Sequence, residues 1–571
     1  MKHRWSYLPG NPLLEKKLLE ELALPPLLAR CLANRGITSS EEANEFLIPR
    51  LNQLRDPFLL PDIDKAVERL WRARESGESM VLFGDYDVDG VTATTLLLDS
   101  LSSLGWQIDW YLPHRMEEGY GLTRQGIENC LEEKPHSLML AVDCGSNANE
   151  SIQWLSGQGV DVIVLDHHQV SDPPPPAVAL VNPQTSNEDP KPFSELCSAG
   201  LAFKLLHALL KHGRDQQTDG FQSFDIRRTL DLVALGTIAD IVPLKGENRL
   251  LVTAGLRCLT KTERPGLVAL KEVAGLEGPI NSQSIGFTLG PRLNAAGRME
   301  TAQDALLLLL SRDLDSAHKL ALQLDTQNRE RQRIDRSIAD QIIGDLKHRF
   351  DENEDLVIVE GELLWHIGVV GIVASKILRR FHRPTFILGG EGGVFRGSGR
   401  SIEGFDLAAA LRECDDLLIA HGGHAMAAGL TIAADQLPAF RDRMKQIASR
   451  QLNKEMLVPE IQLDAEASLA ELGLRQLEDL GALEPTGNSN PAVVVSVSNL
   501  RMLGSPYYMG KEKQHVRFDV SDGTAESKVV WWNAGDASLP SGSFSIACAP
   551  EINEYKGRRS AQLRLIDWRP C

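Results

Sequence analysis

The sequence predicts an α/β protein with a parallel-sheet domain and a second α/β domain joined by a long helix, followed by a C-terminal β-barrel. Short apolar runs alternate with helical stretches between residues 78 and 245, the pattern of a parallel sheet covered on both faces. A charged amphipathic stretch without proline covers residues 314–346 and predicts one long helix, or two joined helices, bridging two lobes or solvated within one domain. Closely spaced β-like runs from about residue 458 predict the barrel.

The chain is long enough for several cores, because 571 residues exceed the usual size of one domain. Its first part reads as a polar helical segment, in which Thr38 or Ser39 can cap a helix with an acidic first turn. The expected divisions are an N-terminal helical segment (1–70), the parallel-sheet domain (71–310), the connecting helix (311–352), the second α/β domain (353–455) and the barrel (456–571).

Composition indicates a soluble globular protein. With 43% hydrophobic and 24% charged residues and no apolar run of 18, the chain is predicted to be neither membrane-spanning nor disordered. The first residues lack a secretory signal and the eight cysteines form no CxxC pair, so we expect a cytoplasmic protein with reduced thiols and no zinc site. A net charge of −18 argues against coating nucleic acid by bulk attraction, but six basic residues against one acid in 365–400 leave room for a focused basic site.

Acidic and imidazole side chains follow three of the predicted strands. The runs "SMVLFG", "LMLAV" and "VIVL" end at Asp85 and Asp87, at Asp143, and at Asp166, His167 and His168. Because ligands of open α/β sheets bind outside the carboxyl ends of the strands, these three segments are expected to deliver polar groups to one edge. The other predicted strands are "QIDWYLP" and "VALVN".

The residue types at this edge suit Mn²⁺ or Mg²⁺, since carboxylates are hard ligands and histidine adds affinity for manganese. Two such ions roughly 3.5–4 Å apart can activate water and stabilise the leaving oxygen of a phosphodiester. Taken alone, the two aspartates after the first run could form a capped turn, and the His-His pair could be structural. Taken together, the ordered motifs favour a metal centre.

These motifs resemble a known family. "DYDVDG", "VDCG", "LDHHQ" and "ALGTIAD" are similar to the four ordered motifs of the DHH phosphoesterase superfamily. "PHRMEEGYGLT", "GPRLNAAGRM", "WHIGVVGIVASKI" and "GGHAMAAG" resemble the RecJ family of single-strand-specific exonucleases, over about residues 30–570. The resemblance implies a DHH domain, a DHH-associated domain and a C-terminal OB-fold.

The resemblance also implies roles at the metal centre. The implied metal ligands are Asp85, Asp87, Asp143, His167 and Asp240. His168 is expected to face the scissile phosphate, and Asp166 to fix an imidazole tautomer through a hydrogen bond. Asp240 is preferred over Asp231 as the ligand from the fourth motif, and Asp89 is expected to hold its loop rather than bind metal.

Substrate contacts are expected from four further motifs. In "FRGSGRS", glycines expose backbone N–H groups beside two guanidinium groups, each of which can form bidentate hydrogen bonds with a phosphate. The alternatives are a tight turn with solvated arginines, or arginines paired with surface acids. The expected substrate-binding residues are Arg115, Tyr120, Arg292, Asn294, Arg298, Arg396, Ser398, Arg400, Gly423 and His424.

The tail reads as an OB-fold with aromatic residues that could stack on bases. Trp531 and Trp532 must face opposite sides of a strand, so at least one belongs to the core. The stretch "EPTGNSNP" (484–491) departs from the junction expected in the family at Thr486 and Ser489. That departure affects the expected docking of the last domain and leaves the metal chemistry intact.

The resemblance implies a metal-dependent exonuclease that degrades single-stranded DNA from the 5′ end to mononucleotides, in recombination and repair. Two other functions stay open: a phosphodiesterase acting on small nucleotides, and a replication scaffold that has lost its chemistry. A scaffold is disfavoured because every expected ligand type is present. The expected partners are single-stranded DNA and a single-strand-binding protein, with no membrane contact and a monomeric state.

Overall fold

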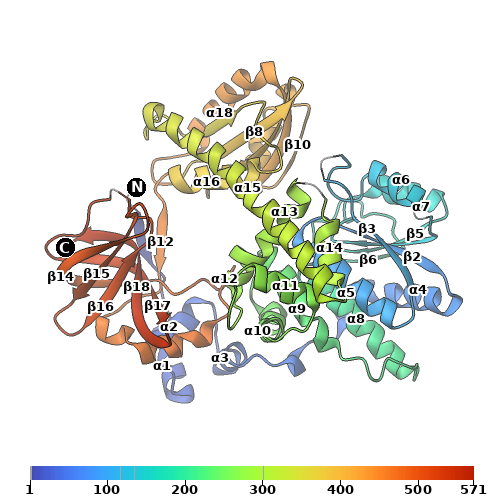
Figure 1. The fold of residues 1–571 in the computed structure, drawn as a ribbon, viewed down its shortest axis with the longest axis horizontal. Coiled ribbons are helices and arrows are strands. Elements are labelled where there is room, and N and C mark those ends of the chain that lie inside the picture. The colour runs from blue at the N-terminus through green and yellow to red at the C-terminus, as the bar shows by residue number, and fades with distance from the viewer. Residues whose placement is uncertain (1–2, 116, 134, 300, 536) are drawn as a thin grey trace. The chain divides into compact units, whose positions relative to one another are not determined.

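The apolar runs between residues 79 and 181 form one five-stranded sheet in the computed structural model (Figure 1). Its strand order is β3-β2-β4-β5-β6, and all neighbouring strands are parallel. The strands are β2 (Ser79–Gly84), β3 (Gln107–Tyr111), β4 (Leu138–Val142), β5 (Asp161–Leu165) and β6 (Ala179–Val181). The parallel sheet predicted from the sequence is therefore confirmed.

The chain forms two compact units. The central unit comprises Glu45–Arg331 and Leu483–Pro491, and the terminal unit comprises Met1–Asn44, Gln332–Ala482 and Ala492–Cys571. The structure describes residues 3–115, 117–133, 135–299, 301–535 and 537–571. No described helix is long and apolar enough to cross a membrane.

Helices cover both faces of the parallel sheet in the central unit, as Figure 1 shows. Leu82 and Leu140 point to one side and join the core formed with α4 (Ile63–Ser76), α5 (Val88–Ser103) and α8 (Ser198–Asp215). Their neighbours Val81 and Met139 point to the other side, where α6 (Arg124–Glu133) and α7 (Asn149–Gly157) pack. The alternation follows the two-residue period of a strand, and burial on both faces explains why the runs are apolar throughout.

Further helices complete the central unit. Helix α5 and the helix of residues Leu230–Ala239 (α9) are buried along most of their length, which accounts for their lack of a polar face. The remaining helices are α10 (Gly246–Thr260), α11 (Pro265–Val273), α12 (Ser282–Ser284), the π-helix η5 (Ile285–Leu289), α13 (Gly290–Met299) and α14 (Gln303–Leu310).

Residues 483–491 belong to the central unit, although they lie far along the chain. The buried Arg249 guanidinium donates to the carbonyls of Leu483 and Glu484 at 3.0 and 2.9 Å. Asn488 Nδ2 donates to the carbonyl of Ile241 at 2.6 Å, and Leu244 N–H donates to the Asn488 carbonyl at 2.9 Å. The junction that departs from the family pattern is thus fastened to the loop that follows α9.

The terminal unit contains a second α/β layer. Its five strands have the order β10-β11-β9-β8-β7, with β7 and β8 parallel and the other pairs antiparallel. The elements are β7 (Ile358–Gly361), α16 (Val370–Phe381), β8 (Thr385–Glu391), β9 (Val394–Arg400), α17 (Leu407–Arg412), β10 (Ala420–Gly423), β11 (Ala427–Ala433) and α18 (Leu437–Gln451).

The same unit contains the C-terminal barrel. Strands run in the order β13-β14-β15-β16-β18-β17, and pairing of β14 with β17 closes the sheet. Trp531 packs against the barrel core whereas Trp532 is exposed, as alternation along a strand requires. The strands of the barrel are β13 (Ala465–Glu466), β14 (Val495–Met509), β15 (His515–Ser521), β16 (Glu526–Trp531), β17 (Phe544–Tyr555) and β18 (Arg558–Pro570). Strand β12 (Glu460–Leu463) precedes the barrel, and α19 (Leu474–Leu480) lies between β13 and β14 in the chain.

The N-terminal segment divides between the two units rather than forming a module of its own. Strand β1 (Arg4–Tyr7) pairs in parallel with β12, and Leu27 of α2 packs on the barrel core. The other helices here are α1 (Pro12–Leu22), α2 (Pro26–Asn34) and α3 (Ser40–Leu47). Helix α15 (Leu314–Arg349) connects the units as one continuous helix, in agreement with the predicted long helix.

Candidate metal centre

The polar residues after β2, β4 and β5 meet at the carboxyl edge of the parallel sheet. His167 Nε2 lies 3.5 Å from Asp143 Oδ1, 3.5 Å from Asp240 Oδ2 and 3.9 Å from Asp89 Oδ2. Three overlapping sets have ligand atoms within 4.8 Å of one another: Asp85, Asp87 and Asp143; Asp89, His167 and Asp240; and Asp143, His167 and His168. All five residues expected as metal ligands therefore lie in one cluster.

Asp87 is also the N-cap of α5. Its Oδ1 accepts hydrogen bonds from the N–H groups of Asp89 and Gly90 at 2.9 and 3.1 Å. The capped turn that sequence offered as an alternative is thus present beside the metal candidates. One carboxylate oxygen caps the helix, and its partner oxygen stays available to a cation.

Asp89 is held by protein groups. Its two carboxylate oxygens accept from the backbone N–H groups of Ser198 and Ala199 at 2.6 and 2.8 Å, at the start of α8. Ser198 Oγ also donates to Asp143 Oδ1 at 2.8 Å. The helix start therefore steadies two acids of the centre through its unsatisfied N–H groups and its dipole. Nothing in the sequence around Ser198 signals this role, because both partners lie more than 50 residues away.

The two ends of α9 separate Asp231 from Asp240. Asp240 is the C-cap and faces His167, whereas Asp231 accepts from Thr262 Oγ1 at 2.9 Å at the opposite end. A helix rise of 1.5 Å per residue places the Cα atoms of these two residues about 14 Å apart along the helix axis. The close packing of α9 depends on Gly236, where an added Cβ would lie 2.8 Å from Asp89 Oδ1.

Burial and mutual repulsion give the acids unusual electrostatics. Burial, followed by neighbouring carboxylates, raises the pKa values of Asp85 and Asp143 well above their usual range. Burial, then Asp89 and Asp87, raises the pKa of Asp240 to about 9. A cation among these groups would relieve both the repulsion and the cost of burying charge.

Two atoms of the cluster fit a metal directly. Among the described residues, neither Asp85 Oδ1 nor His167 Nε2 has a hydrogen-bond partner, although both atoms are buried. Buried polar atoms are rarely left without a partner, so cations are the expected partners of these two atoms, which belong to different ligand sets. Burial also lowers the pKa of His167, which keeps the ring neutral and able to coordinate.

His168 belongs to a hydrogen-bonded row. Its Nδ1 lies 2.7 Å from Asp166 Oδ1, and its Nε2 lies 3.0 Å from the Tyr120 hydroxyl. Although burial opposes charge on the ring, the bond to Asp166 raises the pKa of His168 to about 9. Burial likewise acts against the Asp166 carboxylate, but hydrogen bonds from His168 and Ser146 lower its pKa to about 2. Asp166 thus orients the imidazole ring.

Two arginines flank this row. The Arg115 guanidinium lies 5.0 Å from the centre of the Tyr86 ring. Burial, then repulsion from Arg115, lowers the pKa of Arg298 to about 10. Gly297 allows α13 to approach the metal loop, since an added Cβ would lie 2.8 Å from the Tyr86 carbonyl.

The other expected contacts of this motif differ in character. Arg292 Nε lies 3.0 Å from Asp325 Oδ1 of α15, and its Nη1 donates to the Thr288 carbonyl at 2.7 Å. These bonds occupy much of the guanidinium, which favours a structural role for Arg292. Asn294 is half-buried on the same helix.

The expected phosphate-binding residues of the terminal unit lie on its five-stranded sheet. Arg396, Ser398 and Arg400 alternate along β9, so their side chains share one face. Arg400 Nη1 donates to Ser398 Oγ at 2.8 Å, and both lie against Gly371 of α16. Gly423 ends β10, and His424 N–H donates to the Ala427 carbonyl at 2.8 Å.

Three family models match the chain. The DHH family, N-terminal domain, matches residues 79–237, the DHHA1 domain matches 354–450, and the RecJ OB domain matches 463–567. The first match covers the parallel sheet and nearly all of the acids of the centre. Fold and site together define a protein of the DHH class with a DHHA1 domain and an OB domain.

Known relatives narrow this class. The single-stranded-DNA-specific exonuclease RecJ of Bacillus subtilis is 36% identical over 572 residues, covering 99% of this chain and 71% of the relative. RecJ of Escherichia coli is 34% identical over 95% of this chain and 96% of its own length. The crystal structure of Thermus thermophilus RecJ in complex with Mn²⁺ superposes with a TM-score of 0.85 at 30% identity, covering all of this chain and 80% of that one. The chain belongs to the RecJ family.

Proposed function

We propose that the protein is a metal-dependent exonuclease that hydrolyses single-stranded DNA from the 5′ end and releases 5′-mononucleotides, in DNA recombination and repair. One observation carries the proposal. Four acids, of which Asp85 and Asp143 are buried, converge with His167 in a chain about one third identical, over nearly its whole length, to single-stranded-DNA-specific exonucleases. Asp85 Oδ1 and His167 Nε2 have no hydrogen-bond partner among the described residues, so both atoms are able to coordinate the metal ions that this reaction needs.

The proposed cofactors are two Mn²⁺ or Mg²⁺ ions, the ions found in crystal structures of Thermus thermophilus RecJ. When bound, such ions supply an activated water and offset the charge that develops on the phosphate. The residues that would hold them are Asp85, Asp87, Asp143, His167 and Asp240. Asp89 is proposed to hold the metal loop in place rather than to bind metal, because both of its carboxylate oxygens accept hydrogen bonds from the start of α8.

His168 is the proposed catalytic residue among the protein groups. Asp166 favours a proton on Nδ1 and fixes the ring, so that an imidazolium can donate from Nε2 to an oxygen of the reacting phosphate. In the structure Nε2 contacts the Tyr120 hydroxyl, which is positioned to hold the same phosphate or the adjacent nucleotide. Half of the Tyr120 side chain is exposed, as a substrate contact requires.

The remaining positive and polar groups are proposed to bind the strand. Arg115 and Arg298 lie beside Tyr86 at the metal loop and would neutralise phosphates there. In the terminal unit, the face of β9 and the glycine-rich end of β10 offer guanidinium and backbone N–H donors to phosphate. These proposed strand contacts are Arg396, Ser398, Arg400, Gly423 and His424, together with Asn294 in the central unit.

The test is digestion of single strands labelled at the 5′ or the 3′ end, in Mn²⁺. We expect release of labelled mononucleotide first from the 5′ end, and losses of at least about 100-fold in kcat for Asp87→Ala and His168→Ala. The exposed acid Asp219 supplies a control variant, Asp219→Ala, with wild-type activity. Faster cleavage of a dinucleotide than of a long strand would favour a small-nucleotide phosphodiesterase, and failure to bind Mn²⁺ would indicate a scaffold.

We further propose that the chain acts as a cytoplasmic monomer beside a single-strand-binding protein. Seven of the eight cysteines are at least partly buried as free thiols, as a reducing compartment permits. Light scattering of the purified chain, alone and mixed with a single-strand-binding protein, tests both parts. A stable dimer, or the absence of any complex, would contradict them.

A further inference from the structure

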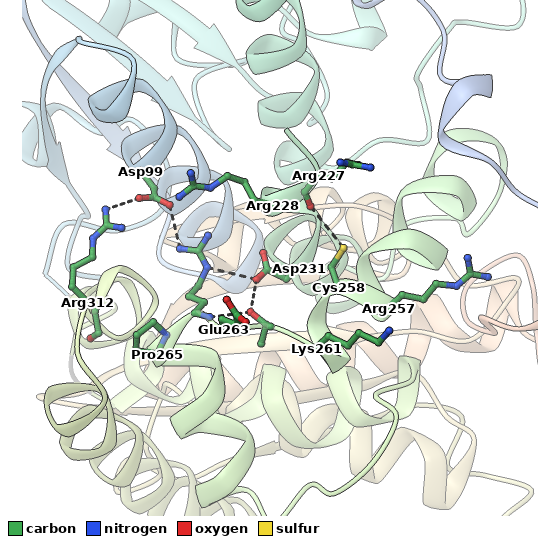
Figure 2. Close-up of a pocket in the computed structure, with 13 residues that line it drawn as sticks. Asp99, Arg227, Arg228, Asp231, Arg257, Cys258, Lys261, Glu263, Pro265 and Arg312 are labelled. Atoms are coloured by element: carbon green, nitrogen blue, oxygen red, sulfur yellow. Dashed lines mark hydrogen bonds and ion pairs between the residues drawn. The ribbon is translucent and has the colours of Figure 1, made fainter. Parts of the chain in front are cut away.

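A second polar cavity lies in the central unit, at a distance from the metal centre. It has a volume of about 790 Å³ and is drawn in Figure 2. Its walls come from α5, the 3₁₀ turn η4 (Ile226–Thr229), the first turn of α9, the end of α10, the start of α11 and residues 311–312. Four stretches of sequence, spread over more than 200 residues, therefore contribute to one cavity.

Basic side chains dominate its lining. The six basic residues are Arg227, Arg228, Arg257, Lys261, Arg264 and Arg312, against the acids Asp99, Asp231 and Glu263. This local charge of +3 occurs in a chain whose net charge is −18. Like charges gathered in this way repel one another, and an anion would remove that cost.

Two of the three acids are already neutralised inside the cavity. Asp99 is bound by Arg264 at 3.4 Å and by Arg312 at 2.6 Å, as the dashed lines of Figure 2 show. Asp231 accepts from Thr262 Oγ1 at 2.9 Å and lies 3.6 Å from Arg264. These contacts hold the acids of the lining in place. Arg227 is paired with Asp225 at 2.7 Å, so the outer cations, those left for a ligand, are Arg228, Arg257 and Lys261.

The outer cations are available to a ligand. In the described part of the chain, no carboxylate forms an ion pair with Arg228, Arg257 or Lys261, and all three side chains are exposed. Arg257 and Lys261 are four residues apart at the end of α10, so they are neighbours on one helix face. The helix dipole favours cations at that end, but it does not explain Arg228, which η4 contributes.

The lining chemistry selects phosphate among anions. Guanidinium groups bind phosphate oxygens through two parallel hydrogen bonds, and a lysine adds a point charge. Among the described residues that line the cavity there is no aromatic ring on which a base could stack. Its uncharged side chains are small, with Cys258 and Pro265 the most apolar, so an acidic peptide would find no pocket for a large apolar anchor.

The cavity is separate from the reaction. Helix α5 carries Asp89 at the metal centre and Asp99 in the cavity, and α9 carries Asp240 and Asp231 in the same two places. The helical rise puts these pairs about 15 and 14 Å apart. We propose that this cavity is a second, non-catalytic anion site that binds phosphate groups through Arg228, Arg257 and Lys261.

The ligand has two possible sources: a phosphorylated small molecule, or the backbone of a nucleic acid strand that extends beyond the catalytic site. The second source rests on the proposed nuclease function. The test uses the full-length chain, Arg257→Ala/Lys261→Ala, and a control, Arg72→Ala/Lys319→Ala, which removes one exposed arginine and one exposed lysine of the same unit. Because all four side chains are exposed, neither change opens the core, and thermal melts check this.

The first measurement is calorimetric titration with inorganic pyrophosphate in one Mg²⁺ buffer, so that ligand speciation is the same for every protein. We expect the wild type to bind pyrophosphate at the cavity. The cavity variant should bind it at least about tenfold more weakly, and the control variant should bind it as tightly as the wild type does. Lys261→Glu, a single charge reversal, should show the same loss. Equal binding by the wild type and both cavity variants overturns the proposal. The proposal is also overturned if poly-glutamate binds through Arg257 and Lys261 while pyrophosphate does not bind.

The second measurement identifies the source. KM and kcat are compared for a thirty-nucleotide single strand and for a dinucleotide, with the same proteins. If the cavity variant loses pyrophosphate binding and raises KM for the long strand alone, with kcat kept, the phosphates belong to nucleic acid. If it loses pyrophosphate binding with both KM values unchanged, the ligand is a free phosphorylated molecule. A failure of the nuclease proposal would instead abolish cleavage of both substrates by the wild type and leave the pyrophosphate result standing.

Discussion

At the scale of single residues, the aspartates of the metal centre have different roles because their hydrogen-bond partners differ. Asp85 keeps a buried oxygen without a hydrogen-bond partner among the described residues, whereas both oxygens of Asp89 accept backbone N–H groups. The sequence predicted Asp85, Asp87 and Asp143 at this edge from the apolar runs that precede them, whereas Asp240 was expected only from the family resemblance. It could suggest but not demonstrate the role of Asp89, since its partners Ser198 and Ala199 lie over 100 residues away.

This contrast makes a prediction for the metal-free protein. Asp85→Asn removes a buried charge from a repelling cluster, so the free energy of unfolding should stay the same or rise. Asp89→Asn places an amide NH₂ against a backbone N–H donor, because both oxygens of Asp89 accept backbone N–H groups. This substitution should lower the free energy of unfolding by about 1–3 kcal/mol. Urea unfolding in the presence of a chelator measures both. Equal destabilisation by the two substitutions would contradict the division of roles.

At the scale of elements, the strands of the parallel sheet were predictable because burial on both faces makes their sequences apolar. The long helix was predicted for the same kind of reason, from its periodicity, and it extends three residues further than expected. Strand β1 was not predicted, because its four residues are partly polar and its partner β12 lies more than 450 residues away. The second basic cavity was not predicted either, since its cations come from three separate segments.

The junction of residues 483–491 is expected to position Asp240. Ile241 has a φ of 61°, a conformation unfavourable for a β-branched residue, and Asn488 holds its carbonyl. Asn488→Ala should therefore weaken Mn²⁺ binding by about three- to tenfold, because the loop that carries Asp240 can relax. Calorimetric titration with Mn²⁺ measures this, with the exposed Asn187→Ala as the control. Unchanged affinity in Asn488→Ala would show that the junction only fastens the chain.

Helix α8 makes the central unit sensitive to acid. Burial, then the charges of Lys204, Lys211 and Arg214, lower the pKa of His207 to about 4, and the charge of Asp56 acts in the opposite direction. In the unfolded chain His207 takes up a proton near pH 6.5, whereas in the folded chain it does so only near pH 4. The free energy of unfolding therefore falls as the pH drops from about 6.5 to about 4. After a discount for solvent screening, the loss is about 1–2 kcal/mol.

His207→Gln should remove that part of the acid sensitivity. The free energy of unfolding, measured with urea at pH 7 and at pH 4.5, should fall less in the variant than in the wild type, by about 1–2 kcal/mol. His348→Gln, at an exposed position in the terminal unit, is the matched control and should behave as the wild type. An identical fall in wild type and His207→Gln would rule out this histidine as the cause.

At the scale of the whole molecule, charge is distributed unevenly. The net charge of −18 includes a cluster of acids in the central unit. Basic side chains mark the β9 face of the terminal unit, where Arg396 is exposed and Arg400 half-buried, and the second cavity. Bulk charge therefore predicts poor general attraction for nucleic acid, and the local sites must supply it. The sequence foresaw one basic stretch, residues 365–400, because its cations lie close together along the chain.

Confinement of the acid cluster to one unit predicts two different responses to metal. Burial and repulsion destabilise the cluster without a cation, and a ligand that binds only the folded state stabilises it by about 2.7 kcal/mol at 100 times its dissociation constant. For a unit of this size, the melting temperature should rise by about 4 °C. The terminal unit contributes none of the clustered ligands among the described residues, so its transition should not move.

Differential scanning calorimetry with and without Mn²⁺ resolves the two transitions, and limited proteolysis assigns each to its unit. Asp85→Asn/Asp143→Asn is the matched variant: its central unit should melt at a temperature independent of Mn²⁺, because two acids of the cluster are gone while the packing volume is kept. Equal shifts of both transitions would mean that Mn²⁺ acts on the whole surface rather than at this centre. A shift that survives in the double variant would move the metal site away from the carboxyl edge of the parallel sheet, and with it the proposed chemistry.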